Sequence, residues 1–134
     1  MADAVTTTSV VDGPRTAVIY CTNTSDGTGE SAITKVDVSA LSTSPEGDAC
    51  TGVRLQRIVF SNVGMGVKVL WNATTNVIAA ELPADYSDTL DYSGISGLPN
   101  VAASGGKTGD IKFTTVGHTS GDTYSVVLHC LKEY

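Results

Sequence analysis

The segment Gly-Asp-Ile-Lys-Phe-Thr-Thr-Val (residues 109–116) and the segment Thr-Tyr-Ser-Val-Val-Leu-His-Cys-Leu (residues 123–131) decide the fold of this chain. In both segments apolar residues alternate with polar ones, which is the pattern of a half-buried β-strand. The stretch between them contains Gly117 and Gly121, so the sequence predicts a hairpin. Its two apolar faces are expected to face each other, with Ile111, Phe113 and Thr115 opposite Tyr124, Val126, Leu128 and Cys130.

Five further stretches toward the N-terminus carry the same alternation, and each is followed by Gly, Pro, Asn or Ser. They are residues 16–22, 33–41, 53–63, 67–71 and 77–82. The first two are expected to be neighbours in one sheet. In the third the apolar phase slips by one residue, which indicates a bulge near Gln56 and Arg57. Residues 73–76 are typical of a hairpin turn.

The irregular stretch of residues 84–108 is predicted to be a long surface loop with one short strand near residues 90–92. Seven or eight strands at this spacing predict an all-β fold, specifically a β-sandwich of the jelly-roll type. An immunoglobulin-like sandwich is the alternative, since periodicity does not reveal strand order. Residues 16–134 are expected to form this single domain, with residues 1–15 as an N-terminal arm or a first edge strand.

Composition limits the class of partner. The 134 residues carry a net charge of −6, and the eight Lys and Arg residues are scattered singly, so no basic stripe is present to bind nucleic acid. The same charge disfavours anionic membranes, and no apolar run approaches the roughly 18 residues of a spanning helix. The start of the chain lacks the apolar stretch of a signal peptide, and the three cysteines fit no disulfide framework, so we expect synthesis in a reducing cytoplasm.

No pattern in the sequence indicates catalysis or a cofactor, and we expect neither. Residues 105–108 (Gly-Gly-Lys-Thr) resemble the end of a phosphate-binding loop, but the first glycine that such a loop requires is replaced by Val101. His129 and Cys130 are neighbours on one strand and therefore point to opposite faces, which prevents a direct nucleophile–base pair.

Two further groups of residues have ordinary explanations. Asp85, Asp88 and Asp91 could offer oxygen ligands to a cation, but their spacing matches no calcium loop, and scattered aspartates in an acidic protein favour solvated turns. We therefore expect no metal site. Trp71 shares the parity of Val69, which predicts a core residue rather than a sugar-stacking platform.

Several phrases of the sequence resemble small virion structural proteins of tailed bacteriophages, many of them marine. They are Ala-Asp-Ala-Val-Thr-Thr and Asp-Gly-Pro-Arg (residues 2–7 and 12–15), Asn-Thr-Ser-Asp-Gly-Thr-Gly-Glu-Ser and Lys-Val-Asp-Val-Ser (23–31 and 35–39), and Gly-Lys-Thr-Gly-Asp-Ile-Lys-Phe-Thr-Thr-Val-Gly-His-Thr-Ser-Gly-Asp-Thr-Tyr (106–124). The resemblance extends over nearly the whole chain. It consists of phrases rather than of a motif with known chemistry.

Among such proteins, a capsid decoration (cement) protein is the class that we favour. The resemblance implies a structural protein, assembled in the host cytoplasm, that binds the exterior of the expanded icosahedral capsid and holds neighbouring major capsid proteins together. Such proteins are commonly homotrimers and sometimes dimers. A tail, baseplate or head-fibre component that contacts host glycans is the alternative. The acidic balance suits an exterior position, because packaged DNA would repel it.

The N-terminal stretch is the first candidate binding site, because an extended arm can add a strand to a capsid protein. An ordinary edge strand in the domain's own sheet is the competing explanation. The candidate contact residues are Asp3, Val5, Thr7, Val10 and Val11 in this stretch, with the valines as apolar anchors, and, as a second choice, Tyr86, Asp88 and Tyr92 in the long loop.

Overall fold

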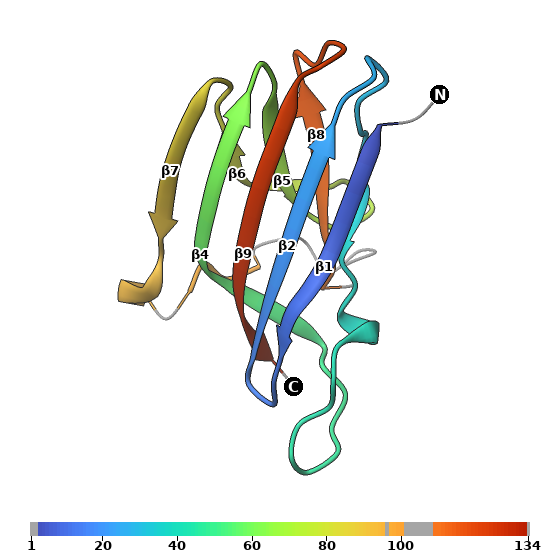
Figure 1. The fold of residues 1–134 in the computed structure, drawn as a ribbon. Helices are drawn as coiled ribbons and strands as arrows, with labels where there is room; N and C mark the ends of the chain where they lie inside the picture. Colours follow the sequence, from blue (N-terminus) through green and yellow to red (C-terminus); the bar gives the residue numbers. More distant parts are fainter. Residues whose placement is uncertain (1–2, 96, 101–108, 134) are drawn as a thin grey trace.

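The computed structural model describes residues 3–95, 97–100 and 109–133. These residues form two antiparallel sheets that pack face to face (Figure 1). The strands are β1 (Ala4–Asp12), β2 (Thr16–Thr24), β3 (Ile33–Val36), β4 (Gly52–Val63), β5 (Gly66–Trp71), β6 (Val77–Leu82), β7 (Tyr86–Asp91), β8 (Ile111–Val116) and β9 (Thr123–Glu133). Two short 3-10 helices, η1 (Val38–Ala40) and η2 (Ser93–Ile95), follow β3 and β7. The fold is all-β, as the alternation predicted.

The strand order is that of a jelly roll. Sheet A has the order β1-β2-β9-β4-β7, and sheet B has the order β3-β8-β5-β6. The antiparallel ladders are nested, because β2 pairs with β9, β3 with β8, β4 with β7 and β5 with β6. This is the double-sheet jelly-roll arrangement, which confirms the predicted sandwich. β1 is added beside β2 at the edge of sheet A, so residues 4–12 are an edge strand of the domain.

The core lies between the two sheets and follows from the alternation. Along β9 every second side chain is buried, from Tyr124 to Lys132. These side chains meet those of β8 across the sandwich, where the ring centroids of Phe113 and Tyr124 lie 5.8 Å apart. Trp71 is fully buried, as its parity predicted. Large aromatic side chains bury the most apolar surface per residue, so this cluster is central to the stability of the sandwich.

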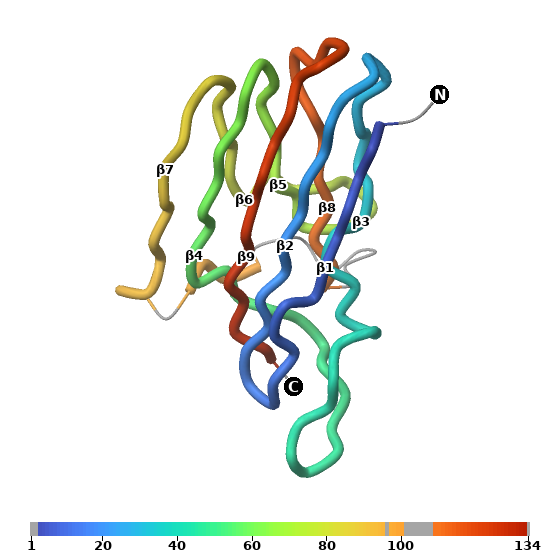
Figure 2. Tube along the Cα trace, viewed as in Figure 1, coloured from blue at the N-terminus to red at the C-terminus, as the bar shows by residue number. Residues whose placement is uncertain are grey.

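The predicted hairpin of β8 and β9 is wrong. β8 belongs to sheet B and β9 to sheet A, and the connection through residues 117–122 passes from one sheet to the other (Figure 2). The two strands do face each other, but across the core rather than side by side in a ladder. β2 and β3, which were expected to be neighbours in one sheet, likewise lie in different sheets. Alternation identifies a strand and its buried face, whereas it carries no information about the partner strand.

Two predicted element boundaries also require correction. The strand expected at residues 33–41 ends at Val36, because the Asp37 side chain accepts a hydrogen bond from the backbone N–H of Ser39 (3.0 Å) and caps η1. The loop expected at residues 84–108 contains a six-residue strand, β7, that pairs with β4 and is longer than the short strand near residues 90–92. Residues 101–108 lie outside the described residues, and with them the whole of the possible phosphate loop.

Two local predictions are confirmed. The register of β4 against β9 shifts between Leu55 and Arg57, which is the expected bulge. β5 and β6 form the expected hairpin, in which the Asn76 side chain accepts a hydrogen bond from the backbone N–H of Ala73 (3.1 Å). In the part of the chain that the structure describes, no helix has the length and apolarity needed to span a membrane.

Candidate functional site

The two sheets of the described chain end in four edge strands, and β1 differs from the other three. β3 has only four residues, β6 carries Glu81, and β7 carries Asp88 and Asp91. β1 has nine residues, is uncharged from Ala4 to Val11, and is exposed at every position. Charges, prolines and short length protect a sheet edge from pairing with another chain. Although its register shifts between Ser9 and Val11, β1 is thus the least protected of the four described edges.

Asp3 fixes the N-terminal end of β1 to the rest of the domain. Its carboxylate accepts hydrogen bonds from Asn23 Nδ2 (3.0 Å) and from the backbone N–H groups of Asp26 and Gly29 (both 3.1 Å). Burial acts to raise the pKa of Asp3, but these hydrogen bonds outweigh it, so the pKa lies below its ordinary value. Asp3, a predicted contact residue, is therefore used inside the protein.

Asp12 fixes the C-terminal end of the same strand. Its carboxylate forms an ion pair with Lys132, whose side chain is fully buried, and accepts a hydrogen bond from the backbone N–H of Ser42 (3.0 Å). Lys132 Nζ also donates to the carbonyl oxygen of Gly13 (2.7 Å). Burial acts to raise the pKa of Asp12, but the hydrogen bonds from Lys132 and Ser42 outweigh it and lower the pKa. β1 is held at both ends while its outer edge is open.

The side chains of β1 are all exposed to solvent, and some of them lie beside crevices at the edge of the sandwich. Val10 and Val11 are 57% and 44% exposed. Val5 lies beside a crevice of about 230 Å³ that Asp3 and Ile33 also line. Thr7 lies in a second crevice of about 230 Å³ between β1 and the β3–η1 segment. A strand added to the outer edge of β1 would therefore find apolar side chains and two hollows beside it.

The second predicted cluster lies on the opposite edge of sheet A. Tyr86 and Asp88 are on β7, and Tyr92 follows it, partly buried against the core. The Tyr86 ring packs against Phe60, with 6.2 Å between the ring centroids. Strands β2, β9 and β4 separate these residues from β1. The structure therefore does not bring the two predicted clusters together into one site.

A buried polar cluster was missed by the sequence analysis. In the alternating stretch of residues 33–41, Lys35 has the parity of a polar strand face, yet its Nζ forms an ion pair with Glu30 Oε2 (2.5 Å) in which both side chains are at most 4% exposed. Glu30 Oε1 accepts hydrogen bonds from Asn23 Nδ2 (2.8 Å) and from the Tyr124 hydroxyl. Burial and the hydrogen bond to Glu30 raise the pKa of Tyr124. The cluster fills the space between the sheets, so its role is structural.

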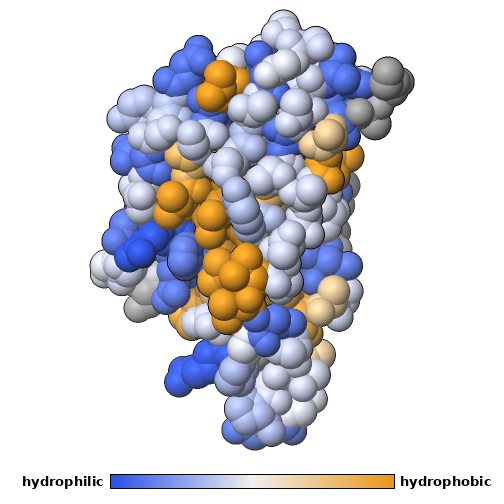
Figure 3. Space-filling view, viewed as in Figure 1, coloured by the Kyte–Doolittle hydropathy of each residue, from blue (hydrophilic) through white to orange (hydrophobic). Residues whose placement is uncertain are grey.

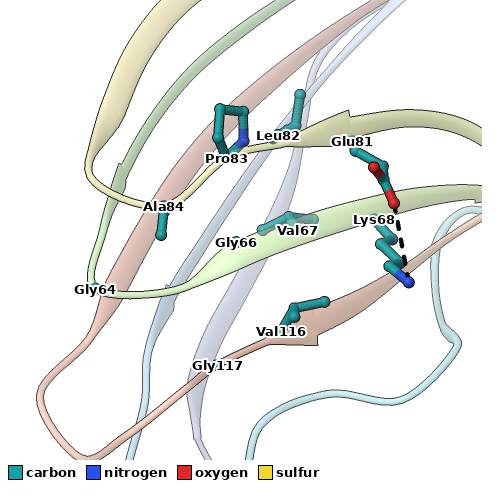
Figure 4. Close-up of a pocket in the computed structure, with 10 residues that line it drawn as sticks. All are labelled: Gly64, Gly66, Val67, Lys68, Glu81, Leu82, Pro83, Ala84, Val116 and Gly117. Atoms are coloured by element: carbon teal, nitrogen blue, oxygen red, sulfur yellow. Dashed lines mark ion pairs between the residues drawn. The ribbon is translucent and has the colours of Figure 1, made fainter.

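An apolar groove of about 380 Å³ lies at the end of sheet B that is next to the β4–β5 turn (Figure 4). Its lining comes from the β4–β5 turn, the end of β6 and the end of β8, and it includes Gly64, Leu82, Pro83 and Val116. The charged groups drawn there are Lys68 and Glu81, which form a solvent-exposed ion pair (3.9 Å). The groove offers apolar contact but no nucleophile beside a base.

The remaining reactive side chains are dispersed or buried. The three cysteines are free thiols in the interior, and burial raises the pKa of Cys21 to about 11 and that of Cys130 to about 12. His129 is on the outer face of β9, opposite in direction to Cys130. Among residues 3–95, 97–100 and 109–133, no group of three His, Cys, Asp or Glu side chains is placed to hold a metal ion.

The chain matches no family model, no curated protein and no solved structure. The candidate site is therefore judged on its own geometry. The open edge of β1, held by Asp3 and Asp12, is the feature that best fits binding to another protein, because its backbone groups are ready to pair with an added strand. The β7 edge, the apolar groove and the buried cluster offer no comparable arrangement.

Proposed function

We propose that this protein is a structural, non-enzymatic component of a bacteriophage virion, specifically a decoration protein on the exterior of the expanded capsid. The resemblance of its sequence to small phage virion proteins supports this assignment. The jelly-roll topology is one that viral capsid domains and lectins share, which supports it at the level of fold analogy alone. Its partner is the major capsid protein.

The single observation that carries the proposal is the open edge of β1. A segment of the capsid protein in extended conformation would pair with this edge through backbone hydrogen bonds, and Val10 and Val11 would contact its side chains. Because Asp3 and Asp12 already hold β1 in place, binding would require little ordering of the strand. Because little free energy is spent on ordering β1, more of the free energy of the contacts contributes to the binding affinity.

Binding that is specific for the expanded shell would stabilise it by mass action. A protein that binds only one of two states lowers the free energy of that state by its own binding free energy at each occupied site. Over many sites, small contributions add up to a large increase in shell stability. Host-glycan binding on a tail or head fibre remains the alternative function, and the capsid experiment distinguishes the two.

The test is cosedimentation of the purified protein with expanded, DNA-free capsids of its phage. We expect saturation at a fixed ratio to the major capsid protein, together with a raised melting temperature of the shell. The variant Val10→Lys places a charge beside the open edge and should weaken binding by more than about tenfold. Ile95→Lys, which changes an equally exposed residue (57%) far from β1, should bind like the wild type.

One result would overturn the proposed function, and another would overturn the β1 edge as the means of binding. Absence of wild-type binding would remove the capsid as partner and move the assignment to the tail or head fibre. Equal binding by Val10→Lys and the wild type would leave a decoration role but would exclude the β1 edge as its means.

A further inference from the structure

We infer that the outer face of sheet A is a self-association surface, on which two copies of this chain pack face to face. This surface is separate from the outer edge of β1. It is formed by the side chains of five strands that point away from the core. The inference concerns contact between copies, so it does not require that the capsid be the partner.

Side chains on this face form continuous rows across the sheet. The valine–tyrosine row contains Thr8, Tyr20, Val127, Val59 and Thr89, which are successive partners on β1, β2, β9, β4 and β7. The hydroxyl row beside it contains Thr6, Thr22, Ser125, Ser61 and Ser87. The third row lies beyond the hydroxyl row, on the side away from the valine–tyrosine row. It contains Ala4, Thr24, Thr123 and Val63.

These three rows contain no charged residue, although the chain as a whole has a net charge of −6. Figure 3 shows this face, with a hydrophobic stripe that crosses it obliquely amid weakly polar residues and with strongly hydrophilic residues mainly at its margins. Val59 and Tyr20, which belong to the valine–tyrosine row, are 36% and 39% exposed. Two acidic molecules repel each other, so they can approach closely only where both surfaces are uncharged.

The hydroxyl groups on the face are bonded to one another. Ser87 donates to Ser61 (2.9 Å), and Ser125 donates to the hydroxyl oxygen of Tyr20 (3.1 Å). The hydroxyls of Thr6 and Thr22 also form a hydrogen bond. Every side chain of the hydroxyl row therefore has a partner within the sheet. Removing water from a polar group costs free energy mainly when its hydrogen bond is lost, so this face can be covered at small cost.

The dimensions of the face fit a weak dimer. Five strands about 4.8 Å apart and three rows about 6.8 Å apart define an area of about 24 by 20 Å. Two such faces together would bury about 1,000 Å², which is the lower limit for a specific interface. We therefore expect a reversible dimer with a dissociation constant on the order of micromolar.

A second copy is the occupant that meets these conditions. In a twofold arrangement each uncharged row lies against an equally uncharged row, and two twisted sheets pack face to face about 10 Å apart. A partner with a charged surface would lose the hydration of its charges without gaining an opposite charge. The face-to-face dimer also leaves the outer edge of β1 free for another strand.

The test is sedimentation equilibrium of the purified protein from about 5 to 200 µM. We expect the mass to rise from that of the 13.8 kDa chain to twice that value. Val59→Lys puts two like charges near each other across the twofold axis, so dimerisation should weaken more than tenfold. The control Ile78→Lys changes a residue of sheet B that is 47% exposed and should dimerise like the wild type.

A wild-type protein that stays monomeric at 200 µM, or that forms a trimer, would overturn the inference. So would a Val59→Lys variant that dimerises as the wild type does. Circular dichroism establishes that each variant is folded, and Ser61→Lys, at an exposed position of the hydroxyl row, provides a second folded variant with the same expected loss. Failure of dimerisation would leave the capsid-binding experiment unaffected, because the two experiments use different surfaces and different variants.

Discussion

Glu30 is the residue on which the interior of this sandwich depends most directly. The Lys35 ammonium is buried beside it, and Asn23 and Tyr124 donate hydrogen bonds to its other carboxylate oxygen. A buried ion pair is often no more stabilising than an apolar pair, but breaking it leaves one charge without a partner in the interior. The energetic consequence of a substitution therefore depends on whether one partner or both are removed.

We expect Glu30→Gln to lower the free energy of unfolding by about 3–5 kcal/mol, because Lys35 would then be an uncompensated buried cation. Urea denaturation monitored by tryptophan fluorescence measures the change. Glu46→Gln makes the same chemical change at an exposed loop position and should alter stability by less than about 0.5 kcal/mol. Equal stability of the two variants would contradict the structural role of the pair.

Gly109 is a second residue with a measurable role, because its backbone has a φ of +87° and a Cβ there would lie 2.4 Å from the carbonyl oxygen of Thr51. We expect Gly109→Ala to lower the free energy of unfolding by on the order of 2–4 kcal/mol. Gly47 has a similar φ of +91° but open space around it. Gly47→Ala should therefore lower the free energy of unfolding by only about 1 kcal/mol. Chemical denaturation of both variants measures the two losses. Equal losses would exclude the steric clash at Gly109.

At the residue scale, parity along a strand was sufficient to predict that Trp71 is buried. It failed for Lys35, whose neighbours in the alternation indicated a solvent-facing side chain. The reason is that Glu30 lies before β3, outside the alternating stretch that contains Lys35. The alternation pattern therefore does not indicate the ion pair. The use of Asp3 inside the protein was missed for the same reason, since its partners lie 20 or more positions away.

At the scale of the element, β1 is a strand held by two carboxylates. The pKa of both Asp3 and Asp12 is lower in the folded protein than the ordinary value of 3.8. Their stabilising contribution is therefore complete above pH 3.8 and is lost as the pH falls through the lowered pKa values. Protonation removes the negative charge of both carboxylates, so it breaks the ion pair with Lys132 and weakens the hydrogen bonds at both ends of the strand.

We expect β1 to detach from β2 in acid before the sandwich as a whole unfolds. Hydrogen–deuterium exchange of the N-terminal peptide, corrected for the intrinsic pH dependence of exchange, should show loss of protection below about pH 3.8. The double variant Asp3→Asn and Asp12→Asn should show the same loss at neutral pH. Protection of β1 that is independent of pH down to pH 2 would contradict this account.

At the scale of the element, the length of a connection did not decide whether two strands pair. β5 and β6 are joined by residues 72–76 and form the predicted hairpin, in which the Asn76 side chain accepts a hydrogen bond from the backbone of Ala73. β8 and β9 are joined by residues 117–122, a connection of nearly the same length, yet they lie in different sheets, and so do β4 and β5, which only residues 64–65 separate. The ladder partners of β8 and β9 are β3, β5, β2 and β4, which no local window of sequence includes.

For the whole molecule, the number and spacing of the strands predicted a jelly roll, and the nested ladders confirm it. Alternation alone did not distinguish a jelly roll from an immunoglobulin-like sandwich, because the nesting is a relation among strands far apart in the chain. Function is less accessible still, since one fold serves many functions. The sequence named residues 3–11 as a candidate binding stretch, but the comparison of β1 with the other three sheet edges required the structure.

The nested ladders predict an order of folding. β5 and β6 are close in sequence, whereas β2 and β9 lie near opposite ends of the chain, and the entropic cost of closing a loop rises with its length. We expect pulse-labelled hydrogen exchange during refolding to show protection of the β5–β6 amides first and of the β2–β9 amides later, in milliseconds to seconds. Simultaneous protection of both ladders would contradict this order.

The dependence of the β1–β2 pair on β9 has a consequence for assembly. β1 has β2 as its neighbour in the sheet, and β2 is placed only when β9 has been synthesised and has folded against it. A truncated or partly folded copy therefore lacks the strand that would join it to a partner. Under the proposed decoration role, only finished molecules would be competent for incorporation, so the dependence of β1 on β9 would act as quality control for the assembled particle.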